Sequence, residues 1–392
     1  MNVPLDLPPL TSDESVHSQL LVDRIRDEIE RCGGWLSFER FMEMALYEPG
    51  LGYYSAGARK LGASGDFVTA PEISPLFSRC LARQCAQVLA ELNGGDILEL
   101  GAGSGAMAAD ILLELAALKR LPNRYLILEV SADLRERQQN TLQARVPELL
   151  SRVTWLDALP DQLVGLVLAN EVLDALPVQR FVIRGDQVNA SGVTWQLGKL
   201  DWSEIRADPD LTAAVRSIEE YVGRALPDGY SSEINLRLNP WFGGIARALQ
   251  RGVMLFIDYG LPRGQYYGVE RNTGTLLCHF RHRFHDDALL NVGIQDIGAW
   301  VDFTAVASVA VDRGCDVLGY NTQAHFLIGC GIETLLADLA HRGLESRLQV
   351  GKQAMVLILP GEMGERFKVI ALGKKWQQAL IGFSVRDMAA AL

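Results

Sequence analysis

Residues 97–105 read ILELGAGSG, and they decide the fold class of the chain. The apolar run at 96–100 is typical of a short buried strand, and the amphipathic stretch after residue 105 is typical of a helix. Glycines permit the tight turn between them and let backbone N–H groups approach a ligand at the helix N-terminus. The segment therefore predicts a cofactor-binding turn at Gly101, Ala102, Gly103 and Gly105.

Strands and helices alternate on both sides of this turn. Such alternation predicts an α/β fold with a parallel sheet that helices cover. The helix after residue 105 is expected to expose Asp110 and Glu114. Near the end of the chain, two apolar runs joined by a glycine-containing loop predict an antiparallel β-hairpin at 355–359 and 367–372.

Acidic residues beside the turn bear on the ligand. Gly101, Gly103 and Ala106 also satisfy the dinucleotide pattern G-x-G-x-x-G/A, so a nicotinamide-dependent oxidoreductase is one alternative. Glu99, directly before the turn, would repel a pyrophosphate but suits the cationic groups of S-adenosylmethionine. Glu129 ends the next expected strand, where a carboxylate can accept hydrogen bonds from ribose hydroxyls. Glu129 indicates a nucleoside in either case, because NAD enzymes use an acid there too, whereas Glu99 favours the methyl donor over NAD.

Three further residues complete the expected cofactor site. Val130 follows Glu129, and Asn170 ends the fourth strand. Asp157 follows the third strand and could bind an adenine amino group, although a solvated turn residue is an equal alternative.

Four other stretches give the chain a resemblance to a known family. They are YEPGLGYY at 47–54, GDFVTAPEIS at 65–74, NEVLDALP at 170–177 and PGEMGERFK at 360–368. With the glycine turn they resemble the MidA family of class I methyltransferases, which includes the mitochondrial complex I assembly factor credited with symmetric arginine dimethylation. The resemblance extends from about residue 37 to residue 374.

This resemblance implies a fold, a domain plan and an activity. The fold is a Rossmann-like sheet of seven strands whose last pair is antiparallel. We expect an N-terminal helical region and active-site loop at 1–76 and core halves at 77–172 and 240–392, with an irregular loop at 259–295. An inserted α+β subdomain is expected at 173–239. The implied activity is methyl transfer from S-adenosylmethionine to a protein arginine; a non-catalytic assembly factor that keeps a nucleoside pocket is a further alternative.

Four acidic residues are the catalytic candidates. Glu171 and Asp174 follow the fourth strand, at the edge where ligands of open α/β sheets bind. Carboxylates there could hold a guanidinium by charge-assisted bonds, although Asp174 could equally cap a helix or turn. Asp66 and Glu72 lie in a long irregular stretch that the resemblance implies to be a wall of the site, and their alternative roles are a turn cap and a solvated residue.

His279, His282 and His285 raise the question of a metal. Arg281 and Arg283 lie between them, and fixed cations beside a zinc ion would oppose its binding. The resemblance implies no metal either, so the segment is interpreted as a polar loop that faces the substrate.

Composition limits the remaining functions. Lys and Arg number 37 and Asp and Glu 48, so the net charge is −11, which argues against non-specific binding of nucleic acid. No apolar run approaches the ~18 residues needed to span a bilayer. Six scattered cysteines without CxxC spacing fit a reducing compartment, and we expect a cytoplasmic protein. Its expected partner is a protein substrate, with a respiratory complex I subunit as one candidate; a homodimer stays open.

Overall fold

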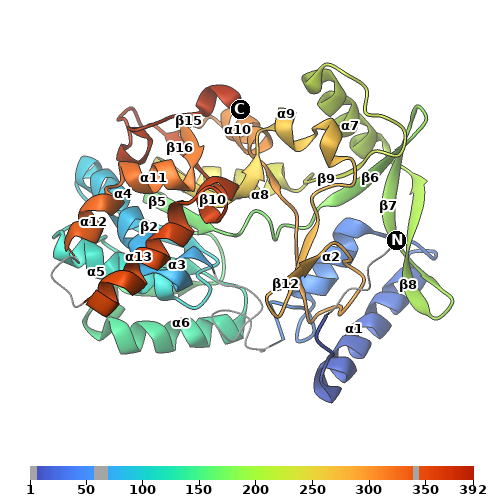
Figure 1. The fold of residues 1–392 in the computed structure, drawn as a ribbon, viewed down its shortest axis with the longest axis horizontal. Coiled ribbons are helices and arrows are strands. Elements are labelled where there is room, and N and C mark those ends of the chain that lie inside the picture. Colours follow the sequence, from blue (N-terminus) through green and yellow to red (C-terminus); the bar gives the residue numbers. More distant parts are fainter. Residues whose placement is uncertain (1–6, 57–68, 339–343) are drawn as a thin grey trace. The chain divides into compact units, whose positions relative to one another are not determined.

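The computed structural model describes residues 7–56, 69–338 and 344–392. Their contacts divide the chain into two compact units, each built from segments that are distant in the sequence (Figure 1). Unit 1 comprises the described residues of Met1–Phe67, Asp174–Leu238 and Leu261–Asp302. Unit 2 comprises those of Val68–Leu173, Asn239–Gly260 and Phe303–Leu392.

A mostly parallel sheet lies at the centre of unit 2. Its strands follow the order β15-β16-β10-β5-β2-β3-β4. The pairs from β10 to β4 are parallel, whereas β16 is antiparallel to both of its neighbours. This order confirms the predicted α/β fold class. The strands are β2 (Asp96–Leu100), β3 (Tyr125–Leu128), β4 (Val153–Leu156), β5 (Leu163–Asn170), β10 (Leu249–Leu261), β15 (Asp316–Thr322) and β16 (Phe367–Lys374).

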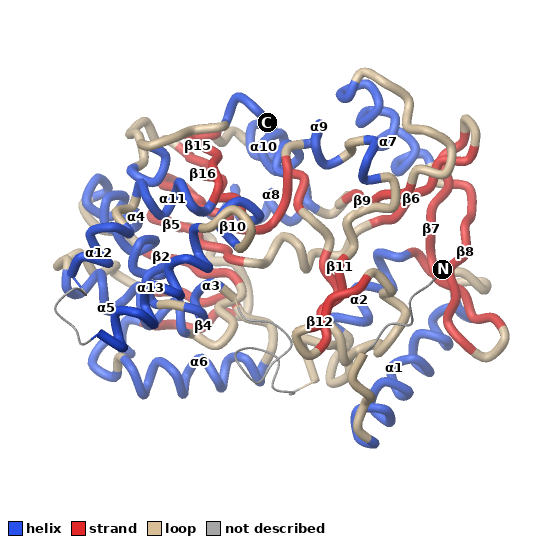
Figure 2. Tube along the Cα trace, in the orientation of Figure 1, coloured by secondary structure: helices blue, strands red, loops and turns tan. Residues whose placement is uncertain are grey.

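Helices surround this sheet, and Figure 2 shows them in blue around the red strands. Their apolar faces and the strands form one buried cluster, to which α4, α5, α11, α12 and α13 contribute. No helix among the described residues is long and apolar enough to cross a membrane. The helices are α3 (Ala70–Ile73), α4 (Pro75–Leu92), α5 (Ala106–Ala117), α6 (Ala132–Arg145), α8 (Leu238–Ala248), α10 (Phe303–Asp312), α11 (Gln323–Gly329), α12 (Ile332–Asp338), α13 (Leu344–Ile358) and α14 (Met363–Arg366).

The acidic residues of α5 are buried, so the expectation that they face solvent was wrong. Asp110 is 5% exposed and accepts a hydrogen bond from Arg145 of α6. Glu114 is 7% exposed and accepts one from Arg79 of α4 at 2.6 Å. The neighbouring helices on both sides supply the cations, and the pattern of α5 alone does not reveal them.

The predicted C-terminal hairpin is also corrected. Residues 355–358 end α13, and β16 pairs with β10 and β15 instead of a strand at 355–359. A short apolar run does not distinguish a strand from the end of a helix.

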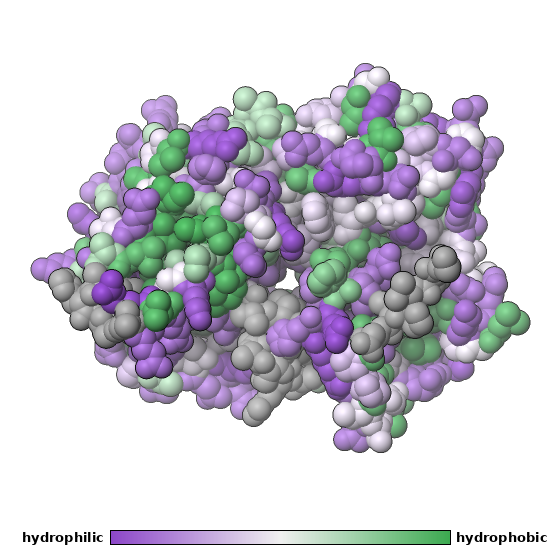
Figure 3. All heavy atoms as spheres, in the orientation of Figure 1, coloured by the Kyte–Doolittle hydropathy of each residue, from purple (hydrophilic) through white to green (hydrophobic). Residues whose placement is uncertain are grey.

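Helix α13 exposes some of its apolar side chains: Met355 is 48% exposed and Leu348 59%, while Leu357 is fully buried. In Figure 3 green side chains gather over the part of unit 2 that includes α13.

Unit 1 contains two antiparallel sheets. One has the order β1-β7-β6-β9 with β8 beside β7, and the other has the order β12-β11-β13. The strands of these two sheets are β1 (Leu36–Ser37), β6 (Gln179–Arg184), β7 (Gln187–Gln196), β8 (Lys199–Arg206), β9 (Ser231–Ile234), β11 (Leu277–Phe280), β12 (Arg283–His285) and β13 (Asp296–Gly298). The two-residue strand β14 (Val301–Asp302) belongs to neither sheet. The helices are α1 (Ser12–Arg31), α2 (Phe38–Tyr47), α7 (Pro209–Val222) and α9 (Arg263–Tyr266).

The domain plan differs from the one expected from the sequence. Contacts group most described residues of the expected N-terminal region at 1–76 and of the expected subdomain at 173–239 into unit 1. The stretch at 259–295 is not irregular, since it contains β11 and β12, and most of it belongs to unit 1 rather than to the core. Segments from three places in the chain thus build one unit, which local patterns cannot show.

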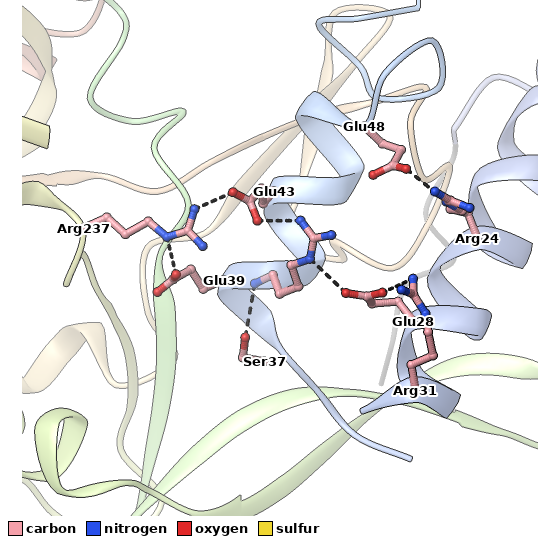
Figure 4. Close-up of polar contacts among 9 residues, drawn as sticks. Arg24, Glu28, Arg31, Ser37, Glu39, Glu43, Glu48 and Arg237 are labelled. Carbon is pink, nitrogen blue, oxygen red and sulfur yellow. Dashed lines mark hydrogen bonds and ion pairs between the residues drawn. The ribbon is translucent and has the colours of Figure 1, made fainter. Parts of the chain in front are cut away.

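Alternating charges join the helices of unit 1 to the segment before α8 (Figure 4). Glu43 of α2 accepts hydrogen bonds from Arg237 at 2.6 Å and from Arg40 at 2.7 Å. Arg40 also donates to Glu28 of α1 at 3.2 Å. Burial opposes ionisation of Glu43, but the hydrogen bonds from Arg237 and Arg40 outweigh it and lower the pKa of this carboxyl group. The network therefore stabilises unit 1 while Glu43 is ionised.

We predict that Glu43→Gln lowers the free energy of unfolding by about 1 kcal/mol at neutral pH, because exposure weakens each ion pair. The pKa of Glu43 is lowered from 4.5 by folding, so its contribution is complete above pH 4.5 and is lost as pH falls through the lower folded pKa. Thermal unfolding of both proteins measures the difference, which should shrink in acid. Glu30→Gln, an exposed change on α1, is the control. An equal effect of both changes would contradict the role of the network.

Candidate functional site

Register brings the carboxyl ends of four strands of unit 2 to one edge of the sheet. Leu100 at the end of β2 lies between Leu128 of β3 and Ala169 of β5, and Asn170 pairs with Ile257 of β10. We call this place the carboxyl edge. Open α/β sheets bind their ligands there.

The glycine turn lies at this edge. The Gly101 N–H donates to the carbonyl of Leu128 at 3.1 Å, which fixes the turn against β3. Gly101, Gly103 and Gly105 all have positive φ, a conformation that L-residues rarely adopt. A Cβ on Gly105 would lie 3.1 Å from the Cα of Gln138, so α6 packs directly against the turn. Ala102 is 6% exposed.

Glu99 is a buried carboxylic acid on β2. It is 1% exposed and accepts a hydrogen bond from the hydroxyl of Tyr125 at 2.6 Å. Burial raises the pKa of Glu99 to about 7; the Tyr125 hydrogen bond opposes this rise, and the charge of Glu129 adds to it. No ion pair involves Glu99 within the described ranges. When Glu99 is ionised, none of these ion pairs neutralises its charge.

Glu129 and Val130 follow β3 with opposite character. Glu129 is 5% exposed and accepts hydrogen bonds from the Ser131 N–H at 3.0 Å and from the Gln138 amide at 3.1 Å. Burial raises the pKa of Glu129, partly opposed by these bonds. Val130 is 79% exposed. A carboxylate beside an exposed apolar side chain suits the hydroxyls and the flat base of a nucleoside.

Arg135 of α6 connects the ends of β3 and β4, a role that the sequence analysis did not find. Its guanidinium donates to the carbonyl of Glu129 at 2.6 Å and to that of Leu156 at 2.5 Å. It also forms an ion pair with Asp157 at 2.8 Å. The Asp157 side chain is 93% exposed, so the structure leaves both expectations for it open. The pattern of α6 gives no signal for Arg135, since arginines are common on exposed helix faces.

Asn170 and Glu171 form a strained turn after β5. Glu171 has φ +54°, in the left-handed region that glycine favours, and its N–H donates to the carbonyl of Ile257 at 2.9 Å. Asn170 donates to the Glu171 carboxylate at 3.0 Å. Asp258, fully buried on β10, accepts a hydrogen bond from the Leu173 N–H at 2.9 Å. Such strain costs of order 1–3 kcal/mol and is typical of functional positions.

The other catalytic candidates have different settings. Glu72 of α3 accepts a hydrogen bond from the hydroxyl of Ser104, so it contacts the glycine turn. Asp174 is 6% exposed and belongs to unit 1, where its carbonyl accepts a hydrogen bond from the Ala299 N–H at 3.0 Å. Asp66 lies outside the described residues.

The three histidines of the expected polar loop lie on a β-hairpin. Cys278 pairs with His285, and His279 pairs with Phe284, so His279 and His285 lie on opposite faces. His282 is in the turn, with φ +60°. In the part of the chain that the structure describes, no group of three His, Cys, Asp or Glu side chains could hold a metal ion.

The residues of the carboxyl edge fit S-adenosylmethionine better than a diphosphate. The turn itself contains no lysine or arginine; Glu99 closely precedes it in the chain, and Glu72 accepts a hydrogen bond from Ser104 of the turn. A diphosphate would meet these negative charges, whereas a sulfonium and an ammonium would be attracted by them. When bound, S-adenosylmethionine supplies a methyl group on a positively charged sulfur.

We predict that the affinity for S-adenosylmethionine rises from about pH 5.5 to about pH 7.5, by up to ~10-fold per pH unit. The physical reason is that a cationic ligand favours ionised Glu99, whose pKa near 7 lies well above its value of 4.5 in water. Binding then releases a proton below pH 7. Calorimetric titration in two buffers of different ionisation enthalpy measures both quantities. Glu99→Gln should bind more weakly and lose this dependence; equal pH profiles for the two proteins would contradict the role of Glu99.

Comparison with known proteins agrees with S-adenosylmethionine as the cofactor. The family model described as "Putative S-adenosyl-L-methionine-dependent methyltransferase" matches residues 80–321. The crystal structure of a Burkholderia thailandensis protein bound to S-adenosyl-homocysteine is 40% identical and covers 99% of this chain and 100% of that one, with a TM-score of 0.94.

Curated relatives match at lower identity over most of the chain. A Caenorhabditis elegans protein named "Protein arginine methyltransferase NDUFAF7 homolog, mitochondrial" is 27% identical, covering 91% of this chain and 86% of its own. The human protein named "Protein arginine methyltransferase NDUFAF7, mitochondrial" is 28% identical, covering 86% and 80%. These matches confirm the resemblance inferred from the sequence blocks. The chain belongs to the family of S-adenosyl-L-methionine-dependent methyltransferases.

Proposed function

We propose that this chain transfers methyl groups from S-adenosylmethionine to arginine side chains of a protein. The observation that carries the proposal is the carboxylate of Glu171 at the carboxyl edge, on a residue whose backbone is strained. Asn170 donates a hydrogen bond to this carboxylate, and the Glu171 N–H donates one to β10. The names of the curated relatives support arginine as the acceptor. The nicotinamide alternative has no support, because the matched family and the acidic turn both favour the methyl donor.

Arginine places particular demands on an enzyme. Its guanidinium is always protonated and offers only N–H donors, so a carboxylate is the natural partner. Glu171 would bind the guanidinium and direct one terminal nitrogen at the methyl group. In the transfer a nitrogen–carbon bond forms, the sulfur–carbon bond breaks and leaves its electron pair on sulfur, and the nitrogen releases one proton to solvent. Because such a displacement requires alignment, the rigid turn around Glu171 supports this role.

The other acids have supporting parts in the proposal. Glu72 is bound to Ser104 of the glycine turn, which supports a role in shaping the turn rather than in holding the acceptor. The role of Asp174 as a guanidinium ligand stays a prediction. Asp66 stays a prediction.

Location and partners also belong to the proposal. A cytoplasmic location and a complex I subunit as acceptor stay predictions, and the curated relatives carry mitochondrial names. A non-catalytic assembly factor is distinguished by experiment, since such a protein would transfer no label. Labelled S-adenosylmethionine, cell extract and chromatography of the hydrolysed proteins identify the methylated residue. Label on methylarginine supports the proposal, and label on lysine or no label at all refutes it.

We predict that Glu171→Gln reduces methyl transfer by about 100-fold or more, because a neutral amide cannot orient the cationic guanidinium. Binding of S-adenosyl-homocysteine should remain within about twofold of the parent, since the proposed role concerns the acceptor. Calorimetry and the labelling assay measure the two quantities. Glu148→Gln, an exposed change after α6, is the matched control. Unchanged transfer by Glu171→Gln would remove this residue from the mechanism.

We predict the opposite trends in stability and activity for Glu171→Gly. Glycine adopts positive φ without strain, so the free energy of unfolding should rise by about 1 kcal/mol while transfer is lost. Thermal unfolding and the labelling assay measure both changes. A loss of stability would show that Glu171 is held for structural reasons.

A further inference from the structure

A glutamine that the sequence analysis did not single out lies at the centre of the cofactor site. Gln138 is on α6, and its side chain is fully buried. Its amide nitrogen donates to the carbonyl of Gly103 and to the carboxylate of Glu129, both at 3.1 Å. Its amide oxygen accepts a hydrogen bond from the indole N–H of Trp155 at 2.9 Å. One side chain thus contacts the glycine turn, the end of β3 and β4.

The direction of this amide is determined by its partners. An indole N–H can only donate, so the atom that faces Trp155 must be the amide oxygen. The NH2 group then faces two acceptors, the Gly103 carbonyl and the Glu129 carboxylate. All three contacts are satisfied at once, which makes the arrangement specific for glutamine. Glutamate would place a second carboxylate against Glu129, and methionine would offer no N–H.

We infer that Gln138 is a positioning residue for the cofactor: it aims the Glu129 carboxylate at the ribose hydroxyls and holds the glycine turn in place. Two observations independent of the amide support this. The Cα of Gln138 lies 3.1 Å from the position that a Cβ on Gly105 would take, so α6 is packed closely against the turn at this residue. Arg135, one turn earlier on α6, holds the Glu129 carbonyl. The helix therefore fixes both the main chain and the side chain of Glu129.

Gln138→Met tests the inference, because it keeps the length of the side chain and removes its hydrogen bonds. We expect S-adenosyl-homocysteine to bind about 10-fold more weakly, the loss of one hydrogen bond to a charged group. Gln143→Met, an exposed change on the same helix, is the matched control and should bind like the parent. Thermal unfolding of the free proteins checks that both variants are folded. Unchanged affinity of Gln138→Met would overturn the inference.

A double-mutant cycle separates positioning from a merely structural role. If Gln138 acts through Glu129, Gln138→Met should cost less than about twofold in affinity when Glu129→Gln is already present. An equal loss in both backgrounds would refute action through Glu129. Adenosine and 2′,3′-dideoxyadenosine give a second readout: the variant should weaken only adenosine, which carries the ribose hydroxyls. Equal weakening of both nucleosides would overturn the inference.

Trp155→Phe keeps the test decisive if Gln138→Met fails to fold. This change removes the N–H that orients the amide and leaves Gln138 and Glu129 in place. We expect a smaller loss of adenosine affinity, about threefold, with binding of the dideoxynucleoside unchanged. An equal loss of affinity for adenosine and for the dideoxynucleoside would contradict the inference.

Discussion

The whole site depends on burying carboxylates at the carboxyl edge of a parallel sheet. The register of β2, β3 and β5 places Glu99 and Glu129 where water is scarce, and hydroxyl and amide groups rather than cations hydrogen-bond them. A buried charge without a partner is unfavourable. These carboxyl groups are therefore either protonated or stabilised by a bound ligand that neutralises or hydrogen-bonds them. The same electrostatics that disfavours a diphosphate favours a cationic sulfonium nucleoside. Fold, choice of cofactor and pH behaviour therefore share one cause.

Backbone conformation supplies the second constraint. The glycine turn adopts positive φ without cost, whereas Glu171 adopts it at the cost of strain. The positive φ of the glycine turn lets its main chain approach a cofactor. The positive φ of Glu171 determines the direction of its charged side chain. The buried carboxylate of Asp258 holds the segment after Glu171 through the Leu173 N–H, so the strain does not relax. Glu171 is the strained position, and it is also the residue to which we assign the binding of the acceptor.

Much of the fold and of the candidate site could be predicted from the sequence, because local patterns indicate strands, helices and turns. The glycine turn and the acids Glu99 and Glu129 follow from the order of residues along the chain. Contacts between distant segments do not: Arg145 donates a hydrogen bond to Asp110, and Gln138 donates one to the carbonyl of Gly103 in the glycine turn. The run at 355–359 was misassigned because an apolar pentamer fits a strand and a helix end equally. The composition of unit 1 from three segments is likewise invisible to any local pattern.

A crystal structure of the chain with S-adenosyl-homocysteine tests the central claim most directly. The account predicts ribose hydroxyls within hydrogen-bond distance of the Glu129 carboxylate, beside Val130, with the amino acid end of the ligand next to the glycine turn. The Gln138 amide should keep its contacts with Glu129 and Gly103. A ligand bound elsewhere, or a ribose turned away from Glu129, would contradict the account.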